Sequence, residues 1–330
     1  MAGRSAIGAN DRPRLVSDVS VGDVSIMLDG GVEVAAGNVP LLIVERALLR
    51  LDGKTSLADI VGAEPALSVD AVEALVASLD AAGLIDDATV LPYRSGAEAI
   101  LEIEERIEVC CASTIYQNPF WRTCLAARGP GDVPQRLATG MVIENWHFLF
   151  RESYFDAPVL SYVSNTAVRR LLNEFFAEEY GHDEILLKSL NFVGLSRDDM
   201  RDAIPLPETM GLCNALAYWA HNDPLFFFAT LGLLEGQGMK HDSFIEACDR
   251  AGLPDAFVGP LRTHANINIG AGHGNLTRLI FRQIPAIDEV TIQRLKAQVP
   301  LFVDLYNAFY SGVWRHYTGD GPLLRRVSEL

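Results

Sequence analysis

Two short stretches of this chain place a glutamate three residues before a histidine within an apolar helical pattern. Glu144 precedes His147, and Glu179 precedes His182. Glu235 is the single carboxylate in a nearly all-apolar run. Removing a carboxylate from water costs several kcal/mol unless a partner compensates it. Glu-x-x-His pairs on two inward-facing helices, with further glutamates from neighbouring helices, hold two iron or manganese ions in helical proteins. The chemistry that these residues predict is that of a metal centre reacting with oxygen.

The residues around the second pair fix its register. Apolar residues recur there at steps of three and four, with Glu179 and His182 among them: Val168, Leu172, Phe175, Leu186 and Leu190. One stripe of a single helix therefore holds them all. Glu178 lies about 100° away around the helix, which favours Glu179 as the ligand. The alternative for this pair is a buried hydrogen bond between Glu179 and His182 without a metal.

The first pair and the isolated glutamate give less certain ligands. Glu144 shares an apolar stripe with Met141 and Phe148, so it is expected to face inward. His147 has the spacing of the second pair, but Phe148 competes with it for the inward position. His147 is therefore a weaker candidate, or a histidine just outside the ligand set. Glu235 would either bind a metal or stay neutral with a raised pKa.

Another ligand helix is expected between residues 256 and 287, a segment that contains no Asp or Glu. Its candidate ligands are His264 and His273. Asn268 shares a face with His264 and is a weaker candidate. His273 is out of phase with His264 on a straight helix, but the glycines around it can bend the helix and redirect the side chain.

Composition sets the class of protein. The chain has 330 residues, 49% of them apolar, which is enough for two domains with full cores. Its net charge of −16 argues against nucleic acid and anionic membranes as partners. The five cysteines show no Cys-x-x-Cys spacing, which predicts reduced, buried thiols. There is no signal peptide and no apolar run of ~18 residues, so we expect a soluble, cytoplasmic protein.

The elements predict a small domain followed by a large one. Residues 1–19 are expected to be an N-terminal tail, and residues 20–92 an α+β winged-helix-like domain. A run of period two, the Asp29-Gly30-Gly31 turn and a second run predict its hairpin. Helices are expected from Pro40 to Leu51, after Ser56 and after Ser68, with a strand at Leu84-Ile85. Residues 98–320 read as helical, with prolines between 205 and 300 separating or beginning the helices.

The small domain does not have the charge of a DNA-binding protein. Residues 41–87 contain three basic and nine acidic side chains, whereas a DNA reader needs a basic face. The patterns at residues 48–60 and 76–85 resemble the peptide-recognition modules of ribosomal-peptide maturation, typified by the pyrroloquinoline-quinone (PQQ) peptide chaperone. The resemblance implies a substrate that is borne on a peptide. The alternative is a structural cap or a dimerising element, which would make the protein a homodimer.

The helical part carries its own resemblance. The motifs occur in the order Gly140–His147, Phe176–Leu186, Pro205–Thr209, Leu234–Gly236 and His264 to His273. In order and spacing they resemble the heme-oxygenase-like diiron oxidases, described as iron-containing redox enzymes, over roughly residues 100–320. The resemblance implies a mainly α protein with a heme-oxygenase-like seven-helix bundle and no heme. It implies two Fe(II) ions per chain, O₂ as co-substrate, and a site of Glu144, Glu179, His182 and Glu235 that is both metal-binding and catalytic.

The chain departs from this family in one helix. The family's final helix adds His, Asp and His at steps of four and three. Here Asn268 or Gly270 stands at the Asp position, and two extra residues separate His264 from His273. A missing carboxylate removes a charge-compensating ligand. We therefore expect one tightly bound iron and one loosely bound iron.

The resemblance also implies a reaction class. Members of the family N-oxygenate amines or cleave carbon–carbon bonds in amino-acid-like or fatty-acid-like substrates. We expect a non-heme diiron oxidase or oxygenase that acts on an amino-acid-like or amine-bearing substrate in a biosynthetic pathway. Arg278 or Arg282 could pair with a substrate carboxylate. Two alternatives stay open: a metal-free enzyme of the same fold, of thiaminase-like or quinone-cofactor-forming type, and a non-enzymatic protein that binds a peptide or other partner.

Overall fold

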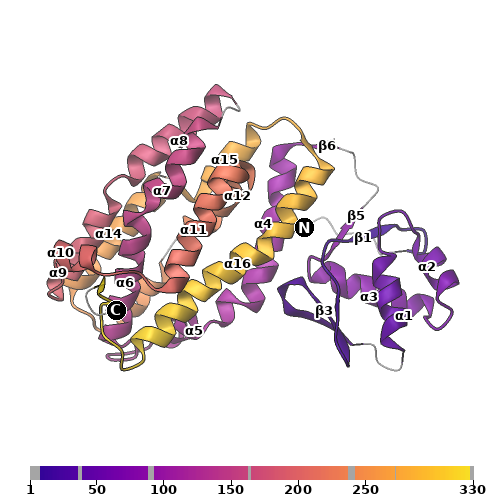
Figure 1. Ribbon diagram of the computed structural model, residues 1–330, viewed down its shortest axis with the longest axis horizontal. Coiled ribbons are helices and arrows are strands. Elements are labelled where there is room, and N and C mark those ends of the chain that lie inside the picture. Colours follow the sequence, from indigo (N-terminus) through magenta and orange to yellow (C-terminus); the bar gives the residue numbers. More distant parts are fainter. Residues whose placement is uncertain are drawn as a thin grey trace. The chain divides into compact units, whose positions relative to one another are not determined.

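The structure is a computed structural model that describes residues 8–35, 39–87, 93–162, 165–236, 242–271 and 273–327. The chain divides into two compact units. The first comprises residues 1–113 and 286–300, and the second comprises residues 114–285 and 301–330. Within the described ranges every strand lies in the first unit, and the second unit is built from helices (Figure 1).

The first unit begins with paired strands. An antiparallel pair is formed by β1 (Pro13–Leu15) and β5 (Ile85–Asp87). An antiparallel three-stranded sheet is formed by β2 (Ser20–Val21), β3 (Ser25–Leu28) and β4 (Val32–Ala35). The predicted hairpin is present, because Leu28 pairs with Val32 across the turn η1 (Asp29–Gly31). Strand β1 lies in the range that was expected to be a tail. It was not predicted because three residues are too few to show a period-two pattern.

Three helices follow near the predicted positions, the second and third of them directly after their predicted N-caps. They are α1 (Leu41–Leu49), α2 (Leu57–Ala63) and α3 (Val69–Ala81). The Ser56 hydroxyl accepts a hydrogen bond from the Asp59 N–H, and the Ser68 hydroxyl accepts one from the Ala71 N–H. Apolar residues of the helices and the sheet form one core, with Ile26, Leu48 and Val76 at most 1% exposed. The likeness of this region to peptide-recognition modules stays a prediction.

Two further segments complete the first unit. One holds β6 (Tyr93–Arg94) and α4 (Gly96–Ser113). The other holds β7 (Ile287–Asp288) and the start of the long helix α16 (Glu289–Tyr317). Strands β6 and β7 pair antiparallel. The chain thus returns to its first unit after passing through most of the second.

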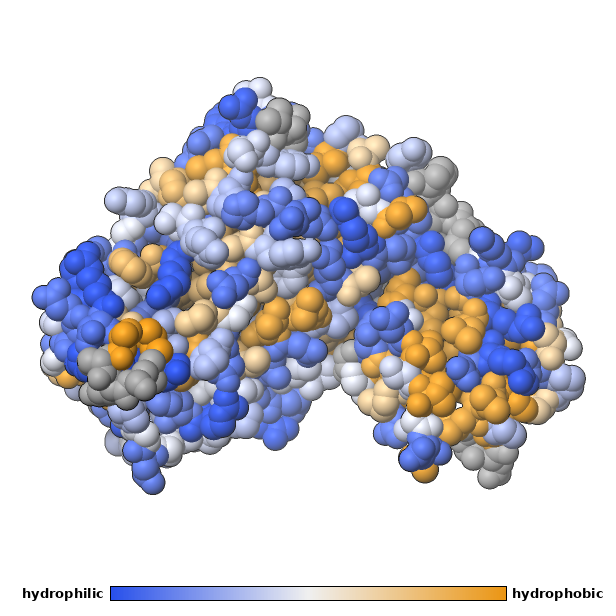
Figure 2. All heavy atoms as spheres, viewed as in Figure 1, coloured by the Kyte–Doolittle hydropathy of each residue, from blue (hydrophilic) through white to orange (hydrophobic). Residues whose placement is uncertain are grey.

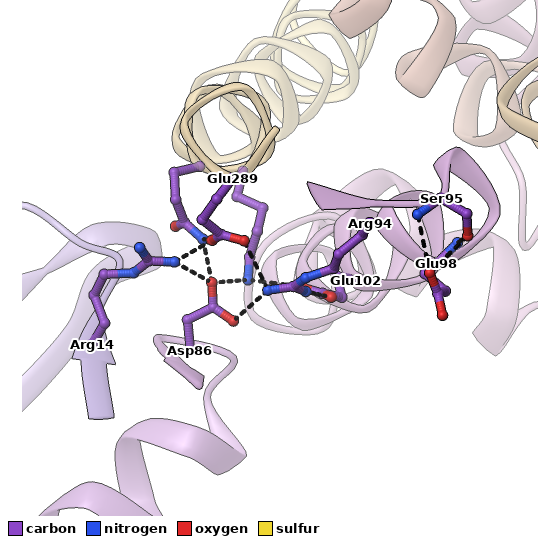
Figure 3. Close-up of polar contacts among 9 residues, drawn as sticks. Arg14, Asp86, Arg94, Ser95, Glu98, Glu102 and Glu289 are labelled. Carbon is purple, nitrogen blue, oxygen red and sulfur yellow. Dashed lines mark hydrogen bonds and ion pairs between the residues drawn. The ribbon is translucent and has the colours of Figure 1, made fainter. Parts of the chain in front are cut away.

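A network of ion pairs fastens this returning segment (Figure 3). Asp86 of β5 accepts a hydrogen bond from Arg14 at 3.0 Å and lies 3.4 Å from the Lys296 Nζ. Glu289 accepts hydrogen bonds from Arg14 and from Arg94. Burial by itself would raise the pKa of Asp86, but Lys296 and Arg14 hold that pKa below its usual value. Removing one partner would leave a buried charge unpaired, so the network strongly constrains how α16 attaches to β1 and β5.

The second unit is a stack of helices. In chain order they are η2 (Ile115–Gln117), α5 (Pro119–Ala126), α6 (Gln135–Phe150), α7 (Glu152–Asp156), η3 (Ala157–Ser161), α8 (Thr166–Glu179), α9 (His182–Phe192), α10 (Arg197–Asp202), α11 (Pro207–Asn222), α12 (Pro224–Leu234), α13 (Ser243–Arg250), α14 (Asp255–Ala271), η4 (His273–Asn275), α15 (Leu276–Arg282) and the remainder of α16. Pro260 and Pro300 lie inside α14 and α16, although prolines were expected to separate helices. Both helices bury large apolar faces beside the proline, which offsets the lost hydrogen bond.

Helix α12 forms the centre of the second unit's core. It begins as predicted, with the Asp223 side chain accepting from the Phe226 N–H and Pro224 in the first turn. Phe226, Phe227 and Phe228 are each at most 1% exposed, so this helix is enclosed on all sides. No helix in the described part of the chain is long and apolar enough to cross a membrane.

The stretch from Val168 to Leu190 is not the single helix that the sequence predicted. Helix α8 ends at Glu179, Gly181 has a φ of 96°, and α9 begins at His182. Every residue of the predicted apolar stripe is nevertheless buried. Glycine adopts a left-handed backbone without steric cost, and one glycine inside a helical pattern fits either a continuous or a broken helix. The break therefore could not be read from spacing.

The cysteines are as expected from their spacing. All five are free and buried. Burial raises the pKa of Cys111, Cys124 and Cys213 to about 12. A thiol reacts and binds metals as its thiolate, so these three side chains contribute packing rather than chemistry near neutral pH.

Candidate metal centre

Glu179 and His182 lie on the two sides of the break between α8 and α9. Their side chains are 2% and 3% exposed. Glu179 Oε2 lies 2.6 Å from His182 Nδ1, yet His182 Nδ1 lacks the geometry of a hydrogen bond. Two atoms that each carry a lone pair lie this close to each other when both bind the same cation. Glu178 is exposed, so the register that favoured Glu179 is the observed one.

Helix α14 brings His264 to this pair. One ligand atom each from Glu179, His182 and His264 can be chosen so that all lie within 4.8 Å of one another. The two imidazole rings meet edge to face, with centroids 4.7 Å apart. Helices α14 and α9 pack against each other, which is why these distant residues meet. Two imidazoles and one carboxylate form the triad that leaves open positions on a non-heme Fe(II).

Glu235 and Asn268 lie beside the triad. Glu235 is half-buried in the C-cap of α12, and its Oε2 accepts a hydrogen bond from Asn268 Nδ2 at 3.0 Å. Asn268 lies one helical turn beyond His264. Gly270, the other position considered for the family's Asp, is exposed and has no atom within 4 Å of where its Cβ would be. Of these two positions, Asn268 is thus the one that contacts Glu235, through a neutral amide.

Two buried carboxylates that sequence reasoning did not select interact electrostatically with this cluster. Glu152 and Asp156 lie one turn apart on α7 and are 8% and 3% exposed. Neither carboxylate oxygen of Asp156 has a hydrogen-bond partner among the described residues. Burial, followed by the charges of neighbouring carboxylates including Glu179 and Glu235, raises the pKa of both well above the usual range. For Glu152, a hydrogen bond with Glu179 adds to this effect.

A weak signal for these two residues exists in the sequence. The apolar stripe of α6 continues at steps of four from Phe148 to Glu152 and Asp156, with Phe155 and Val159 buried close by. The next residue on the stripe after Phe148 is acidic, and an acidic residue at that position is typical of a helix end exposed to solvent. The fold instead restarts a short helix after Arg151 and turns both acids inward.

This donor set suits a divalent cation. Glu152, Asp156, Glu179 and Glu235 act on one another electrostatically, and no Lys or Arg appears among the charges that shift Glu152 and Asp156. Carboxylates this close cannot all ionise in a buried site unless cations compensate them. Imidazole and carboxylate donors together favour iron or manganese, whereas an all-oxygen shell would favour magnesium or calcium. The residues present therefore fit the iron that the sequence led us to expect.

Glu144 is buried as predicted but belongs to a different polar cluster. Its Oε2 accepts hydrogen bonds from the Leu206 N–H at 3.0 Å and from the Thr209 hydroxyl. Its Oε1 accepts one from the Tyr317 hydroxyl at 2.8 Å. Burial raises the pKa of Glu144, and these donors partly oppose the rise. This carboxylate is occupied by protein donors, and it is not in the group that Glu179, His182 and His264 form among the described residues, where it was expected. Spacing showed that it faces inward but not what it faces.

His147 also lies outside the metal cluster. Its Nδ1 is 3.2 Å from Arg151 Nη1, and its Nε2 is buried without a hydrogen-bond partner in the described ranges. Burial lowers the pKa of His147 to about 3, and the Arg151 charge contributes. The imidazole is therefore neutral at physiological pH. The adjacent guanidinium disfavours a metal ion there, which argues against the weaker ligand prediction.

The structure tests two of the three remaining predicted residues. The backbone of His273 begins η4, but its side chain lies outside the described part of the structure. Arg278 and Arg282 are exposed on α15 and do not line the cavity at the centre. The expected pairing of either arginine with a substrate carboxylate has no geometric support here.

A cavity of about 100 Å³ borders the cluster. Glu179, Glu235, His264 and Asn268 form its polar end. Its apolar wall consists of Phe148, Leu149, Leu186, Leu212, Leu234 and Phe309. Asn145 and Tyr306 are the other polar residues in contact with it, and none of the described lining residues is Lys or Arg. The cavity is therefore small, with polar and apolar lining, and its charged lining residues are carboxylates rather than Lys or Arg.

Comparison with known proteins agrees with this geometry. Residues 146–307 match the family described as iron-containing redox enzyme. Every described residue of the metal cluster lies inside that range, and Glu144 lies just before it. Residues 146–307 are thus similar to iron-containing redox enzymes, the family that the motifs of the helical part resemble.

A solved structure shows the fold. A domain of unknown function with a heme oxygenase-like fold from Shewanella denitrificans is similar to this chain with a TM-score of 0.54. The two are 17% identical, and the match covers 66% of this chain and 93% of that domain. The predicted heme-oxygenase-like fold is confirmed. No curated protein matches the chain.

Proposed function

Because residues 146–307 match a family of iron-containing redox enzymes, we propose that this protein is a non-heme iron oxidase or oxygenase that uses O₂. The convergence of Glu179, His182 and His264 within 4.8 Å carries the proposal. Glu152 and Glu235 would complete the ligands around two Fe(II) ions. When bound, the iron would supply electrons and open coordination positions for O₂.

The chain's own residues would control the surroundings of that chemistry. Phe148, Leu212 and Phe309 wall the cavity and keep bulk water from it. The hydrogen bond between Glu152 and Glu179 holds a proton within the cluster while no cation is present. Binding a cation would release that proton, because metal ligands must be deprotonated. The amide of Asn268 fixes one oxygen of Glu235.

The cavity supports an amine-bearing substrate over one anchored by a carboxylate. Its polar end is acidic, and its described lining includes neither Lys nor Arg. A substrate amine is attracted by the carboxylates, whereas a substrate carboxylate would be repelled. The small volume suits a compact group, such as the side chain or amino end of an amino-acid-like molecule. N-oxygenation of an amine, or oxidative cleavage next to it, is therefore the reaction that we propose.

Iron loading tests this function directly. The full chain is made metal-free, mixed anaerobically with Fe(II), desalted and analysed for iron. Iron is expected in the wild-type protein and in Glu178→Ala, which alters an exposed neighbour, but not in Glu179→Ala. Oxygen uptake with amine-bearing amino acids as probes should exceed uptake with the matched N-acetylated compounds. Absence of iron uptake in the wild type would reject the proposal and favour a metal-free acid–base enzyme built on Glu152 and Glu179.

The first unit supports a peptide-borne form of the substrate. Val21, Val24 and Met27, in and between β2 and β3, are 45%, 82% and 39% exposed. Figure 2 shows hydrophobic side chains gathered on the visible face of this unit. β2 is an edge strand, and edge strands bind peptides by adding a strand. Short random peptides displayed on phage should be enriched by the wild-type chain and not by Val24→Asp. Equal enrichment by both would favour a structural role.

A further inference from the structure

The two carboxylates of α7 differ in their hydrogen bonds. Glu152 has a hydrogen bond to Glu179. Asp156 is 3% exposed, and neither of its oxygens has a hydrogen-bond partner in the described ranges. Its electrostatic neighbours are Glu235 and Glu179. A buried carboxylate without hydrogen-bond donors, whose electrostatic neighbours are other carboxylates, lacks a compensating group among the described residues.

On helix α14, an uncharged side chain lies beside Glu235. Asn268 stands one turn beyond His264, and its Nδ2 donates to Glu235 at 3.0 Å. Its Oδ1 is buried and has no hydrogen-bond partner among the described residues. A carbonyl oxygen there can still reach a cation, but it carries no charge. Helix α14 therefore offers Glu235 a neutral amide, whereas α7 offers a buried acid that has Glu235 as an electrostatic neighbour.

We propose that Asp156 is a metal ligand that replaces the acid missing at Asn268, so that the second cation is held from α7 instead of α14. This inference rests on the proposed iron centre. The charges agree with it: Glu152, Asp156, Glu179 and Glu235 are four carboxylates, and two divalent cations neutralise four negative charges. Asp156 and Glu152 lie one turn apart, so one face of α7 presents both. Two cations, not one, then match the anions of the site.

Metal titration of exchanged variants tests this assignment. Metal-free full chain is titrated anaerobically with Fe(II), and separately with Mn(II) as a redox-inert probe, and the bound ions are counted. The wild type should bind two ions. Asp156→Asn should bind one, with the second step weakened by about 100-fold or more, because a direct ligand contributes at least as much as an outer-shell partner. The double variant Asp156→Asn/Asn268→Asp should regain the second ion.

The control is Glu178→Gln, which changes an exposed carboxylate beside Glu179 and should bind two ions. Thermal unfolding of the metal-free proteins detects a folding defect. Asp156→Asn removes a buried acid whose ionised form has no compensating partner among the described residues, so the melting temperature should not fall. Two ions bound by Asp156→Asn with wild-type affinity would overturn the ligand assignment and leave the iron enzyme standing. If the double variant does not regain the second ion, the proposal that Asp156 replaces the acid missing at Asn268 is wrong. A wild type that binds no Fe(II) would overturn the proposed function together with this inference.

Discussion

The two Glu-x-x-His motifs of this chain have the same spacing and different surroundings. Glu144 and Glu179 are 1% and 2% exposed, so both are buried. The carboxylate of Glu144 accepts hydrogen bonds from Leu206, Thr209 and Tyr317. Glu179 instead faces His182 and other carboxylates, which are electron-pair donors themselves. A buried carboxylate surrounded by N–H and O–H groups is already satisfied, whereas one surrounded by acceptors requires a cation.

The backbone amplifies this difference. Helix α6 runs unbroken through Glu144 and His147, and His147 turns to Arg151 rather than to a second carboxylate. The second motif contains Gly181, whose left-handed conformation separates α8 from α9. The first motif therefore joins helices by hydrogen bonds, and the second collects ligand atoms. Substitutions in each cluster should affect different properties.

The largest effect is expected from Glu144→Ala. It leaves the donors of Leu206, Thr209 and Tyr317 buried without an acceptor, which should lower the free energy of unfolding by about 3–5 kcal/mol. Glu144→Gln keeps one oxygen and should lose less. Urea unfolding measures both. Iron bound per folded chain should not change, and loss of iron from well-folded Glu144→Gln would return Glu144 to the ligand set.

Glu179→Ala should have the converse effect. Iron affinity should fall by about 100-fold or more, since a direct ligand matters at least as much as an outer-shell partner. The free energy of unfolding of the metal-free protein should not fall by more than about 1 kcal/mol, because a poorly compensated buried charge is removed. Equilibrium dialysis with Fe(II) and urea unfolding give the two quantities. Strong destabilisation with unaltered iron binding would mean that the two motifs act alike.

Gly140→Ala tests the Glu144 cluster by changing its packing without changing a polar group. A Cβ at Gly140 would lie 2.1 Å from Cγ of Tyr317, so the ring that donates to Glu144 must move. Overpacking of this kind costs about 1–3 kcal/mol of unfolding free energy. Thermal unfolding should show the loss, while the Fe(II) titration stays as in the wild type. A neutral substitution would show that the Tyr317 contact is dispensable.

The smallest effect concerns pH at His147. Its pKa is lowered to about 3 by burial and by Arg151, so the unfolded chain binds the proton more readily. The free energy of unfolding should therefore fall as pH falls below about 6.5, by up to about 1.4 kcal/mol per pH unit. His147→Gln should flatten this dependence between pH 7 and 5. Parallel pH profiles for the two proteins would contradict the neutral, buried imidazole.

Local sequence signals predicted much of the fold. Ser56 and Ser68 predicted helix starts because an N-cap hydroxyl acts on backbone N–H groups within the next turn. Periodicity placed Glu179 inside and Glu178 outside. Strand β1 and the break at Gly181 were missed, because a three-residue strand and a single glycine carry too little local information.

The amino-acid order by itself determined the helical class, the positions of most helices, the burial of both motif glutamates and the likeness of residues 146–307 to iron-containing redox enzymes. Those properties depend on side chains within one or two helical turns, or on motifs in sequence order. Only the tertiary structure decided that Glu152 and Asp156 join Glu179, that Glu144 does not, and that Asn268 rather than Gly270 faces Glu235. The role of a buried carboxylate is set by the donors and acceptors that packing brings from other helices, and spacing along one helix does not specify them.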